Sequence, residues 1–428
     1  MNEVKPLKGQ LLLPGDKSIS HRSAMFSVLA TGKSIIENVS DGGDVSSTIS
    51  VLKTLGANIS LEGTTLTTNG TGLVSLSGDN INLDCGNSGT SFRLFCGLLS
   101  GQNVNNVSLI GDESLSKRPQ DRVVIPLQSI GVNIKSNNGL APVTISSSIP
   151  HSKTLVSKVA SAQVKSAVLL SGLYADGPVT NIEKTLTREH TENMLSQMGV
   201  KIEKSNTEQG HVATITPPKA PLSPLNGTVP ADPSSAAFFG ISAVIIPGSD
   251  LTIMNMLGSD TRIGWLKVLE RMGANIEILE KDEVFGEKTI DVRIQYSKLS
   301  AVEISGEEIS SMVDELPMLS IAMSRAQGTS RVRDASELRV KESDRITVVL
   351  EHLNQLGINT VEYEDGYDIT GTDIPLKRCE INAHHDHRIA MTFIIANYLV
   401  DGVLTKSNLD IISTSFPSFF NLFEQVIS

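Results

Sequence analysis

A short phrase recurs five times along this chain and constrains its fold more than any other feature. It reads apolar residue, Gly, small residue, polar residue, Ile, with a looser fifth copy at 356–360, and it follows amphipathic stretches such as 45–55 and 263–272. Glycine after such a stretch is typical of a helix that ends in the left-handed conformation before a strand begins. The phrase therefore predicts five helix-to-strand connections, whose glycines are Gly56, Gly131, Gly199, Gly273 and Gly357.

Six other segments are apolar or small on nearly all sides, which is typical of buried helices. They recur about every 70 residues, with β-rich pieces such as 33–39 and 104–111 among them. We therefore expect an α+β fold made of six repeats of a strand–helix–strand–helix–strand unit. The predicted buried helices are His21–Ala30, Gly89–Leu99, Ala162–Leu173, Ser234–Ile246, Leu316–Ala326 and His387–Val400.

Composition and charge exclude several classes of protein. The 428 residues include 47 acidic and 36 basic ones, and a net charge of -11 argues against binding nucleic acid through overall charge. No apolar run reaches the roughly 18 residues of a membrane span, and the apolar stretch 11–13 is too short for a signal peptide. Three scattered cysteines do not make a disulfide framework. We expect a soluble cytoplasmic protein that binds anions through local clusters of cations.

The starts of the predicted buried helices carry such cations. A helix N-terminus presents unpaired N–H groups and the positive end of a dipole, so anions bind there readily. Capping explains a Ser at these positions, but it does not explain the basic residues beside it. The first three helix starts carry Lys17, Ser18 and Arg22, then Gly89 and Arg93, then Ser161, Gln163 and Lys165. Together with Arg188, the third set suits a phosphate monoester.

The fifth unit combines carboxylates with cations. Lys341 and Arg345 have the i, i+4 spacing of one helix face at a predicted helix start, and Asp314 heads the buried helix of the same unit. An exposed ion-pair network is the alternative interpretation of such a mixed run. If these groups converge, the cations can bind an anion and the carboxylate can transfer a proton beside it. In the sixth unit, the segment 384–388 (HHDHR) lacks further ligands at metal-binding spacing, and Arg388 at the helix start is the more informative residue.

Eight ordered motifs make the chain similar to the 5-enolpyruvylshikimate-3-phosphate (EPSP) synthase family of enolpyruvyl transferases. The motifs are PGDKSISHR, GNSGTSFR, SKRP, SAQVKSA, TREHTE, DELP, RVKESDR and DHRIAM, and the resemblance extends from Lys17 to 415–420. It implies transfer of the enolpyruvyl group of phosphoenolpyruvate to the 5-hydroxyl of shikimate 3-phosphate, with release of phosphate. This reaction belongs to the shikimate pathway of chorismate and aromatic amino acid biosynthesis. The resemblance implies no metal or organic cofactor, and a monomer that binds neither nucleic acid nor membrane.

The resemblance also implies a particular architecture. The expected fold is a two-domain inside-out α/β barrel, or α–β prism, with three repeats in each domain. One domain spans residues 14–229 and is expected to bind shikimate 3-phosphate. The other spans 1–13 and 230–428 and is expected to carry the phosphoenolpyruvate and catalytic side. The active site is expected in the cleft between the domains, which would close when shikimate 3-phosphate binds.

The resemblance assigns roles to individual residues by motif. The shikimate 3-phosphate ligands would be Lys17, Ser18, Arg22, Ser161, Ala162, Gln163, Arg188, Asp314 and Lys341. The phosphoenolpyruvate ligands would be Lys17, Gly89, Arg118, Gln163, Arg345 and Arg388. Asp314 would take the proton of the attacking hydroxyl, Glu342 would transfer a proton at the enol carbon, and Lys341 would lie between the substrates. Lys17 is the fourth expected catalytic residue.

Two other functions are alternatives to this one. UDP-N-acetylglucosamine enolpyruvyl transferase is similar in fold and chemistry, but it normally has a loop cysteine where this chain has Lys117, Arg118 and Pro119. A non-catalytic repeat module that binds a polyanion is disfavoured by the net charge of -11 and by carboxylates next to the cations. One branch of the family has a lysine where this chain has Thr414 and an asparagine where it has Glu337, so we assign no lysine contact in the sixth unit.

Overall fold

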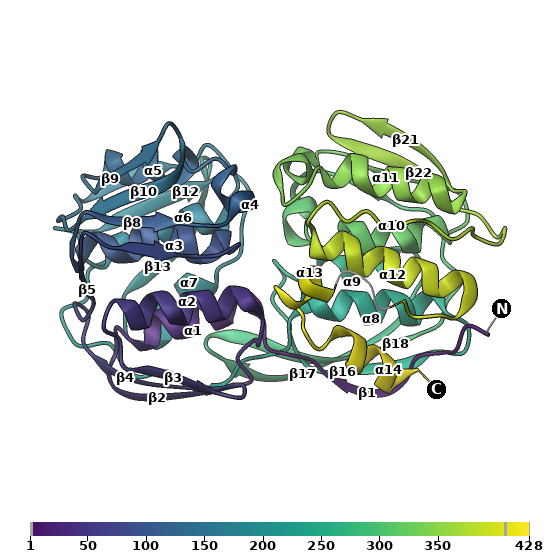
Figure 1. Cartoon of the computed structure of the whole chain (residues 1–428), viewed down its shortest axis with the longest axis horizontal. Coiled ribbons are helices and arrows are strands. Elements are labelled where there is room, and N and C mark those ends of the chain that lie inside the picture. Colours follow the sequence, from purple (N-terminus) through teal and green to yellow (C-terminus); the bar gives the residue numbers. More distant parts are fainter. Residues whose placement is uncertain (1–2, 406–408, 428) are drawn as a thin grey trace. The chain divides into compact units, whose positions relative to one another are not determined.

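The computed structural model describes residues 3–405 and 409–427, and the chain divides into two compact units (Figure 1). Unit 1 comprises Met1–Pro14, Pro230–Asp282 and Lys288–Ser428, and unit 2 comprises Gly15–Val229 and Glu283–Glu287. The predicted second domain includes residues 1–2, 406–408 and 428, which lie outside the described part. Each unit contains helices and sheets, which agrees with the predicted α+β class.

Three buried helices form the centre of unit 2. They are α1 (Lys17–Ser27), α3 (Gly89–Leu98) and α6 (Ala162–Gly172), and most of their residues are buried, as is typical of helices that are small or apolar on nearly all sides. Helices α3 and α6 pack very closely: a Cβ atom added at Gly97 would lie only 2.0 Å from the carbonyl oxygen of Ala167. Glycine at this position therefore lets the two backbones approach each other.

Three four-stranded sheets surround these helices with one strand pattern. Their orders are β15-β2-β4-β3, β6-β8-β10-β9 and β11-β12-β14-β13, and the first two strands of each are parallel while the others pair antiparallel. In Figure 1, β2, β3 and β4 lie in one layer against α1 and α2. The strand bounds are β15 Asn226–Thr228, β2 Thr31–Glu37, β4 Thr65–Thr71, β3 Ile59–Glu62, β6 Asn82–Asp84, β8 Val107–Ile110, β10 Leu140–Ser146, β9 Asn133–Asn137, β11 Lys153–Val156, β12 Val179–Glu183, β14 Gly210–Ile215 and β13 Ile202–Thr207.

The other elements of unit 2 are shorter or lie at its surface. Strands β5 (Ser77–Asp79) and β7 (Asn103–Asn105) form a small parallel sheet. Amphipathic helices bury one face and expose the other. The remaining helices are α2 (Gly43–Thr54), α4 (Glu113–Ser116), α5 (Asp121–Ser129), α7 (His190–Gln197) and the 3-10 helix Leu99–Gly101.

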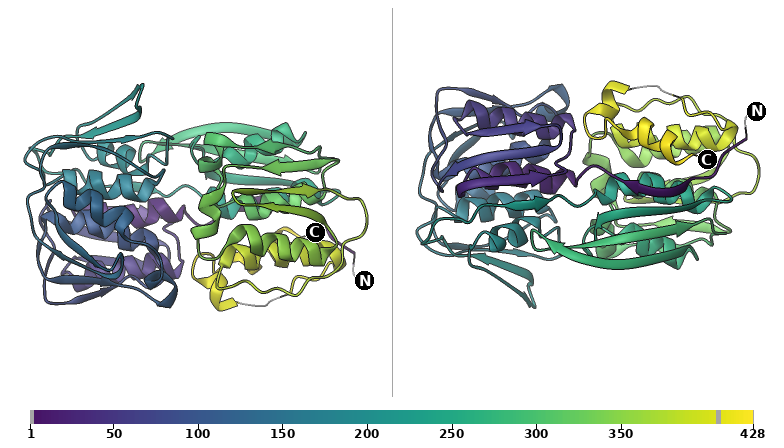
Figure 2. Two further views of the ribbon diagram at one scale, coloured as in Figure 1. Left: turned by 90° about the horizontal axis from the view of Figure 1, so that it is seen from above. Right: turned by 90° about the horizontal axis from the view of Figure 1, so that it is seen from below.

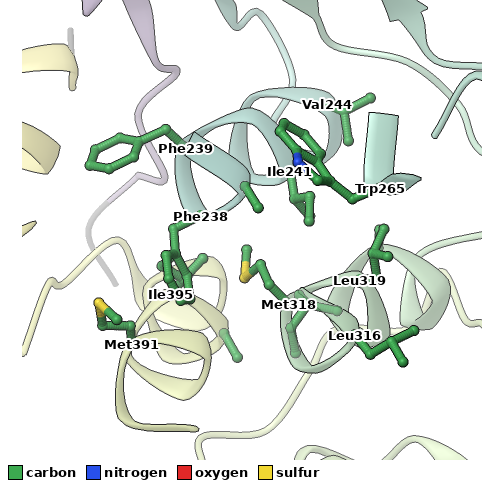
Figure 3. Close-up of a cluster of buried hydrophobic side chains, with 14 of the residues drawn as sticks. Phe238, Phe239, Ile241, Val244, Trp265, Leu316, Met318, Leu319, Met391 and Ile395 are labelled. Atoms are coloured by element: carbon green, nitrogen blue, oxygen red, sulfur yellow. The ribbon is translucent and has the colours of Figure 1, made fainter. Parts of the chain in front are cut away.

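Unit 1 also has three buried helices in contact with one another: α8 (Pro233–Ile245), α10 (Leu316–Ser324) and α12 (His387–Asp401). Figure 3 shows Phe238 of α8, Met318 of α10 and Ile395 of α12 turned toward one another, with Trp265 of α9 (Gly264–Arg271) beside α8. All four side chains are at most 3% exposed. Because these side chains are apolar, their burial holds the three helices together.

In the described part of unit 1, two four-stranded sheets have the orders β1-β16-β18-β17 and β19-β20-β22-β21. Helix α14 (Phe419–Val426) lies beside β1, and Leu7 bridges Ile427 near the two chain ends (Figure 2). The strand bounds are β1 Lys8–Leu12, β16 Asp250–Leu257, β18 Glu287–Gln295, β17 Asn275–Val284, β19 Glu303–Ile304, β20 Thr329–Val332, β22 Gly366–Thr370 and β21 Asn359–Tyr363. The other helices are α11 (Arg345–Leu356), α13 (Leu409–Ser413) and the 3-10 helices Gly306–Ser311 and Ser336–Val340.

The structure confirms the predicted buried helices and the predicted helix ends. All six predicted buried helices are present, although α1 begins at Lys17 rather than His21 because the Asp16 side chain caps it. The five glycines of the recurring phrase all have left-handed φ values, between +85° and +95°. In the described part of the chain, no helix has both the length and the apolar character needed to cross a membrane.

Candidate active site

The N-terminus of α1 presents two of the predicted substrate ligands. Asp16 precedes the helix, and its carboxylate accepts a hydrogen bond from the N–H of Ile19 at 2.8 Å. Lys17 is the first residue of the helix, and its Nζ atom lies 3.1 Å from Oδ2 of Asp44 on α2. The side chains of Lys17 and Ser18 are both half-buried. They are therefore accessible at a helix end where anions bind.

Arg22 lies one turn further along α1 and is almost completely buried. Its Nε donates to Oγ1 of Thr191 at 2.8 Å, its Nη2 to Oγ of Ser166 at 2.7 Å, and its Nη1 to the carbonyl of Ser18 at 3.0 Å. Burial lowers the pKa of the guanidinium to about 10, so it stays charged at neutral pH. A guanidinium has five N–H groups. Since three of them bind residues in the described part of the chain, two remain for a ligand.

The N-terminus of α3 lies beside two guanidinium groups. A Cβ atom added at Gly89 would lie 3.4 Å from Nη1 of Arg93 and 3.5 Å from Nη1 of Arg118. Arg118 donates in turn to Oδ1 of Asn87 at 2.9 Å and to Oγ of Ser114 at 3.1 Å. Helix N–H groups and two cations thus gather at Gly89, and this combination favours an anion.

Gln163 connects the start of α6 to α3. Nη1 of Arg93 donates to its Oε1 at 2.5 Å, and its own Nε2 donates to Oγ1 of Thr90 at 3.1 Å. Ser161 and Ala162 precede it, and the hydroxyl of Ser161 caps the helix. These three residues at the helix start are half-buried, so a ligand can reach them.

The prediction that Lys165 helps to bind a phosphate monoester is wrong. Its side chain is 2% exposed, and its Nζ atom lies 2.6 Å from Oε1 of Glu183 and 2.9 Å from Oε1 of Glu192. Burial disfavours the ammonium, but Glu192 and Glu183 outweigh it and raise the pKa of Lys165. The spacing along α6 could not reveal this pairing, because both carboxylates come from later segments of the chain.

Arg188 lies in the segment before α7 and is half-buried. Burial and nearby carboxylates have the largest effects on the pKa of Arg22. The positive charge of Arg188 also lowers that pKa. The two cations are therefore close enough to repel each other. An anion bound beside both of them would relieve this repulsion.

In unit 1, the carboxylate predicted to act as a base lies among three cations. Nη1 of Arg345 donates to Oδ1 of Asp314 at 3.1 Å, and Nζ of Lys341 lies 4.0 Å from the same oxygen. Nη2 of Arg388 lies 3.9 Å from Oδ2, and its Nη1 donates to the carbonyl of Asp314 at 3.3 Å. Three cations that the sequence placed in two different repeats thus meet at one carboxylate.

Two further carboxylates complete this cluster. Nη2 of Arg345 donates to Oε2 of Glu342 at 2.7 Å, and its Nε donates to Oδ2 of Asp386 at 2.8 Å. Burial opposes the charge of Arg345, but Asp386, Glu342 and Asp314 outweigh it and raise the pKa of Arg345. Asp386 also accepts from the N–H of Arg388 at 2.9 Å as the cap of α12. One buried carboxylate therefore positions both predicted phosphoenolpyruvate cations of unit 1.

Lys341 and Arg345 do not lie on one helix, contrary to the prediction. Helix α11 begins at Arg345 because the Asp344 side chain accepts a hydrogen bond from the N–H of Thr347 at 3.2 Å. Lys341 precedes this cap with an extended backbone. The two cations nevertheless meet at Asp314, so their convergence does not depend on a shared helix face.

The sequence comparisons decide the family. Residues 1–423 match the family model described as EPSP synthase (3-phosphoshikimate 1-carboxyvinyltransferase). The chain belongs to the EPSP synthase family. A 3-phosphoshikimate 1-carboxyvinyltransferase from Citrifermentans bemidjiense is 43% identical over 426 residues, which are 99% of this chain and 98% of that protein. The enzyme of that name from Lactococcus lactis subsp. cremoris is 43% identical over 426 residues, 98% of this chain and 97% of the relative.

Solved structures agree with membership of the EPSP synthase family. EPSP synthase from Acinetobacter baumannii superimposes with a TM-score of 0.87 at 36% identity, covering 100% of this chain and 97% of that one. The enolpyruvyl transferase NikO from Streptomyces tendae has a TM-score of 0.75 at 16% identity, covering 99% of this chain and 96% of that one. At that identity, the second likeness concerns the fold alone.

Several partners of the predicted EPSP synthase residues were missed by sequence reasoning. Asp386 lies at a predicted helix start, where capping explains an Asp, but its contact with Arg345 was not foreseen. Asp44, Thr191 and Ser166 gave no signal, because their contacts with Lys17 and Arg22 come from separate elements. Among residues 3–405 and 409–427, no group of His, Cys, Asp or Glu has the geometry of a metal site.

Proposed function

We propose that this member of the EPSP synthase family transfers the enolpyruvyl group of phosphoenolpyruvate to the 5-hydroxyl of shikimate 3-phosphate and releases phosphate. The observation that carries the proposal is the position of Asp314, 3.1 Å from a guanidinium nitrogen of Arg345 and close to Arg388 and Lys341. A carboxylate among cations can accept a proton beside an anionic substrate. Family membership supports the same reaction.

Shikimate 3-phosphate is proposed to bind to unit 2 through several helix starts. Ser161, the N–H of Ala162 and Gln163 hold the phosphate at the start of α6, where helix N–H groups favour an anion. The two remaining donors of Arg22, together with Ser18 and Arg188, bind the remainder of the substrate. The buried hydrogen bonds of Arg22 support this role, because they fix the guanidinium in one orientation.

Phosphoenolpyruvate is proposed to bind to four cations and to two uncharged residues, Gly89 and Gln163. Unit 2 supplies Lys17, Gly89, Arg118 and Gln163, and unit 1 supplies Arg345 and Arg388. The two substrates repel each other by roughly 4 kcal/mol per pair of unit charges at 4 Å in an effective dielectric of 20. The cations offset this repulsion when the substrates are brought together.

The proposed chemistry has two stages. First, a proton is added to the methylene carbon of phosphoenolpyruvate, the 5-hydroxyl attacks the adjacent carbon, and Asp314 takes the hydroxyl proton. In the second stage the tetrahedral adduct loses phosphate, and a proton leaves the new methyl group to restore the double bond. Glu342 and Lys17 share proton transfer at this carbon, while Lys341 lies between the substrates and stabilises their charges.

We propose further that each unit is one domain of three repeats with the inside-out α–β prism architecture. The three buried helices and the three sheets of equal strand order in unit 2 support this assignment. We also propose that the protein is monomeric, as the resemblance to the family implies, and cytoplasmic, because its cysteines Cys85, Cys96 and Cys379 are free thiols, which suits a reducing compartment.

A phosphate-release assay tests the proposal. We expect release only when shikimate 3-phosphate and phosphoenolpyruvate are both present, and no release with either alone. UDP-N-acetylglucosamine serves as the alternative acceptor. Phosphate release with that acceptor, and none with shikimate 3-phosphate, would assign the chain to the sister reaction instead.

A further inference from the structure

The end of β17, the turn after it and the first residue of β18 form the segment Glu283–Glu287, which belongs to unit 2, although the rest of both strands belongs to unit 1. Phe285 in this segment is buried and has a φ of 56°, which is rare for a bulky residue. A Cβ atom added at Gly227 would lie 3.5 Å from Cζ of Phe285, so the ring packs against unit 2 residues. Packing therefore maintains a turn that a free hairpin with this sequence would not favour.

The segment ends with a buried carboxylate that contacts one helix twice. The residue Glu287 is 3% exposed, and its Oε1 lies 2.7 Å from Nδ1 of His190. The same oxygen accepts a hydrogen bond from Nδ2 of Asn193 at 3.0 Å. Both partners belong to α7, so a displacement of Glu287 would displace the start of that helix.

The first turn of α7 is also connected to the proposed substrate site. Thr191 accepts the 2.8 Å hydrogen bond from Nε of Arg22 and donates to Oγ of Ser166 at 2.7 Å. Arg188 lies just before the helix, and the N-cap residue Glu189 makes no side-chain cap. The start of α7 is therefore held by its side-chain partners and not by a capping hydrogen bond.

We infer that Glu287 is a positioning residue for the binding of shikimate 3-phosphate. It holds α7 through His190 and Asn193, and α7 in turn orients Arg22 through Thr191. The inference rests on the proposed function, because that proposal makes Arg22 and Arg188 substrate ligands. Glu287 acts through these residues and does not itself contact the substrate.

The test is steady-state kinetics of Glu287→Ala, with titration calorimetry of shikimate 3-phosphate alone. We expect KM and Kd for shikimate 3-phosphate to rise roughly 10- to 100-fold, as expected for a small displacement of a binding group, while KM for phosphoenolpyruvate changes less than about threefold. Glu287→Gln keeps an acceptor oxygen for both partners and should restore KM to within about threefold of the parent. Glu283→Ala removes an exposed carboxylate of the same segment and should have no effect.

The possible failures are distinguishable. If the parent protein neither binds shikimate 3-phosphate nor releases phosphate, the proposed function is wrong. If the parent is active and a folded Glu287→Ala protein has unchanged KM and Kd for shikimate 3-phosphate, the inference is wrong. Equal increases in KM for both substrates would also overturn it. If Glu287→Ala does not fold, Asn193→Ala decides, because this half-buried residue provides one of the two contacts and should give the same selective rise.

Discussion

Nη1 of Arg345 lies 3.1 Å from Oδ1 of Asp314, and the same guanidinium contacts Glu342 and Asp386. A single buried cation thus holds three carboxylates, of which Asp314 and Glu342 are proposed to transfer protons. Because Arg345 is 1% exposed, its contacts fix the positions of these carboxylates more firmly than a surface ion pair would.

Replacing the proposed base should abolish turnover without unfolding the protein. Asp314→Asn keeps the size of the side chain and one acceptor oxygen for Arg345, but an amide cannot take the hydroxyl proton. We expect kcat to fall about 10²- to 10⁴-fold, with a melting temperature close to that of the parent. Phosphate release measures the effect, and Glu307→Gln, an exposed carboxylate of the same unit, is the control. Parent-like turnover in Asp314→Asn would remove Asp314 from the mechanism.

A methyl group at Gly89 should weaken the binding of phosphoenolpyruvate selectively. The new Cβ would lie 3.4 Å from Arg93 and 3.5 Å from Arg118, in the space where the substrate is proposed to bind. We expect Gly89→Ala to raise KM for phosphoenolpyruvate roughly tenfold, with little effect on KM for shikimate 3-phosphate. Stability should not fall, because Gly89 begins a helix with no left-handed φ and alanine favours helix. An unchanged KM for phosphoenolpyruvate would place that substrate elsewhere.

Local features of the sequence predicted the helices well. The six buried helices are apolar or small on nearly all sides, and the five glycines mark helix ends by their own conformational freedom, so both signals lie within short windows. Strand pairing could not be predicted in this way. Lys8 of β1 pairs with Asp250 of β16, and nothing in the sequence around Lys8 indicates that distant partner. The order of strands in each sheet therefore follows from the structure and not from the sequence.

For the candidate site, the sequence predicted residue types better than contacts. Asp314, Arg345 and Arg388 were identified through their motifs, and they do converge. Lys165 was misassigned because helix spacing shows which residues share a face, but not which partners that face meets. The ammonium of Lys165 pairs with two carboxylates from later segments. Glu183 lies 18 positions and Glu192 lies 27 positions further along the chain.

Removing the buried ammonium of Lys165 should destabilise the protein strongly. Lys165→Met keeps the approximate volume but leaves Glu183 and Glu192 buried without their cation. We expect a loss of about 3–5 kcal/mol in the free energy of unfolding, measured by denaturant titration. Lys204→Met removes a partly exposed pair with Glu189 and one hydrogen bond to Asn193, and it should cost less than about 1 kcal/mol. Equal losses in the two variants would show that the buried pairing of Lys165 stabilises the protein no more than the pairing of Lys204 does.

His21 should make stability depend on pH. It is fully buried, its Nδ1 lies 2.7 Å from Oγ1 of Thr48, and burial together with the charges of Lys17 and Arg22 lowers its pKa well below the ordinary value. Below about pH 6.5, the unfolded chain therefore binds a proton that the folded chain excludes, and this uptake favours unfolding.

The expected slope gives the test. The contribution of His21 is fully present above about pH 6.5 and is lost as the pH falls, by up to about 1.4 kcal/mol per pH unit for one proton. Denaturant titrations of the parent and of His21→Asn over this range compare the two slopes. Asparagine does not titrate, so the variant, although less stable at neutral pH, should lose less stability on acidification. Parallel slopes would mean that the His21 ring is protonated as readily in the folded protein as in the unfolded chain.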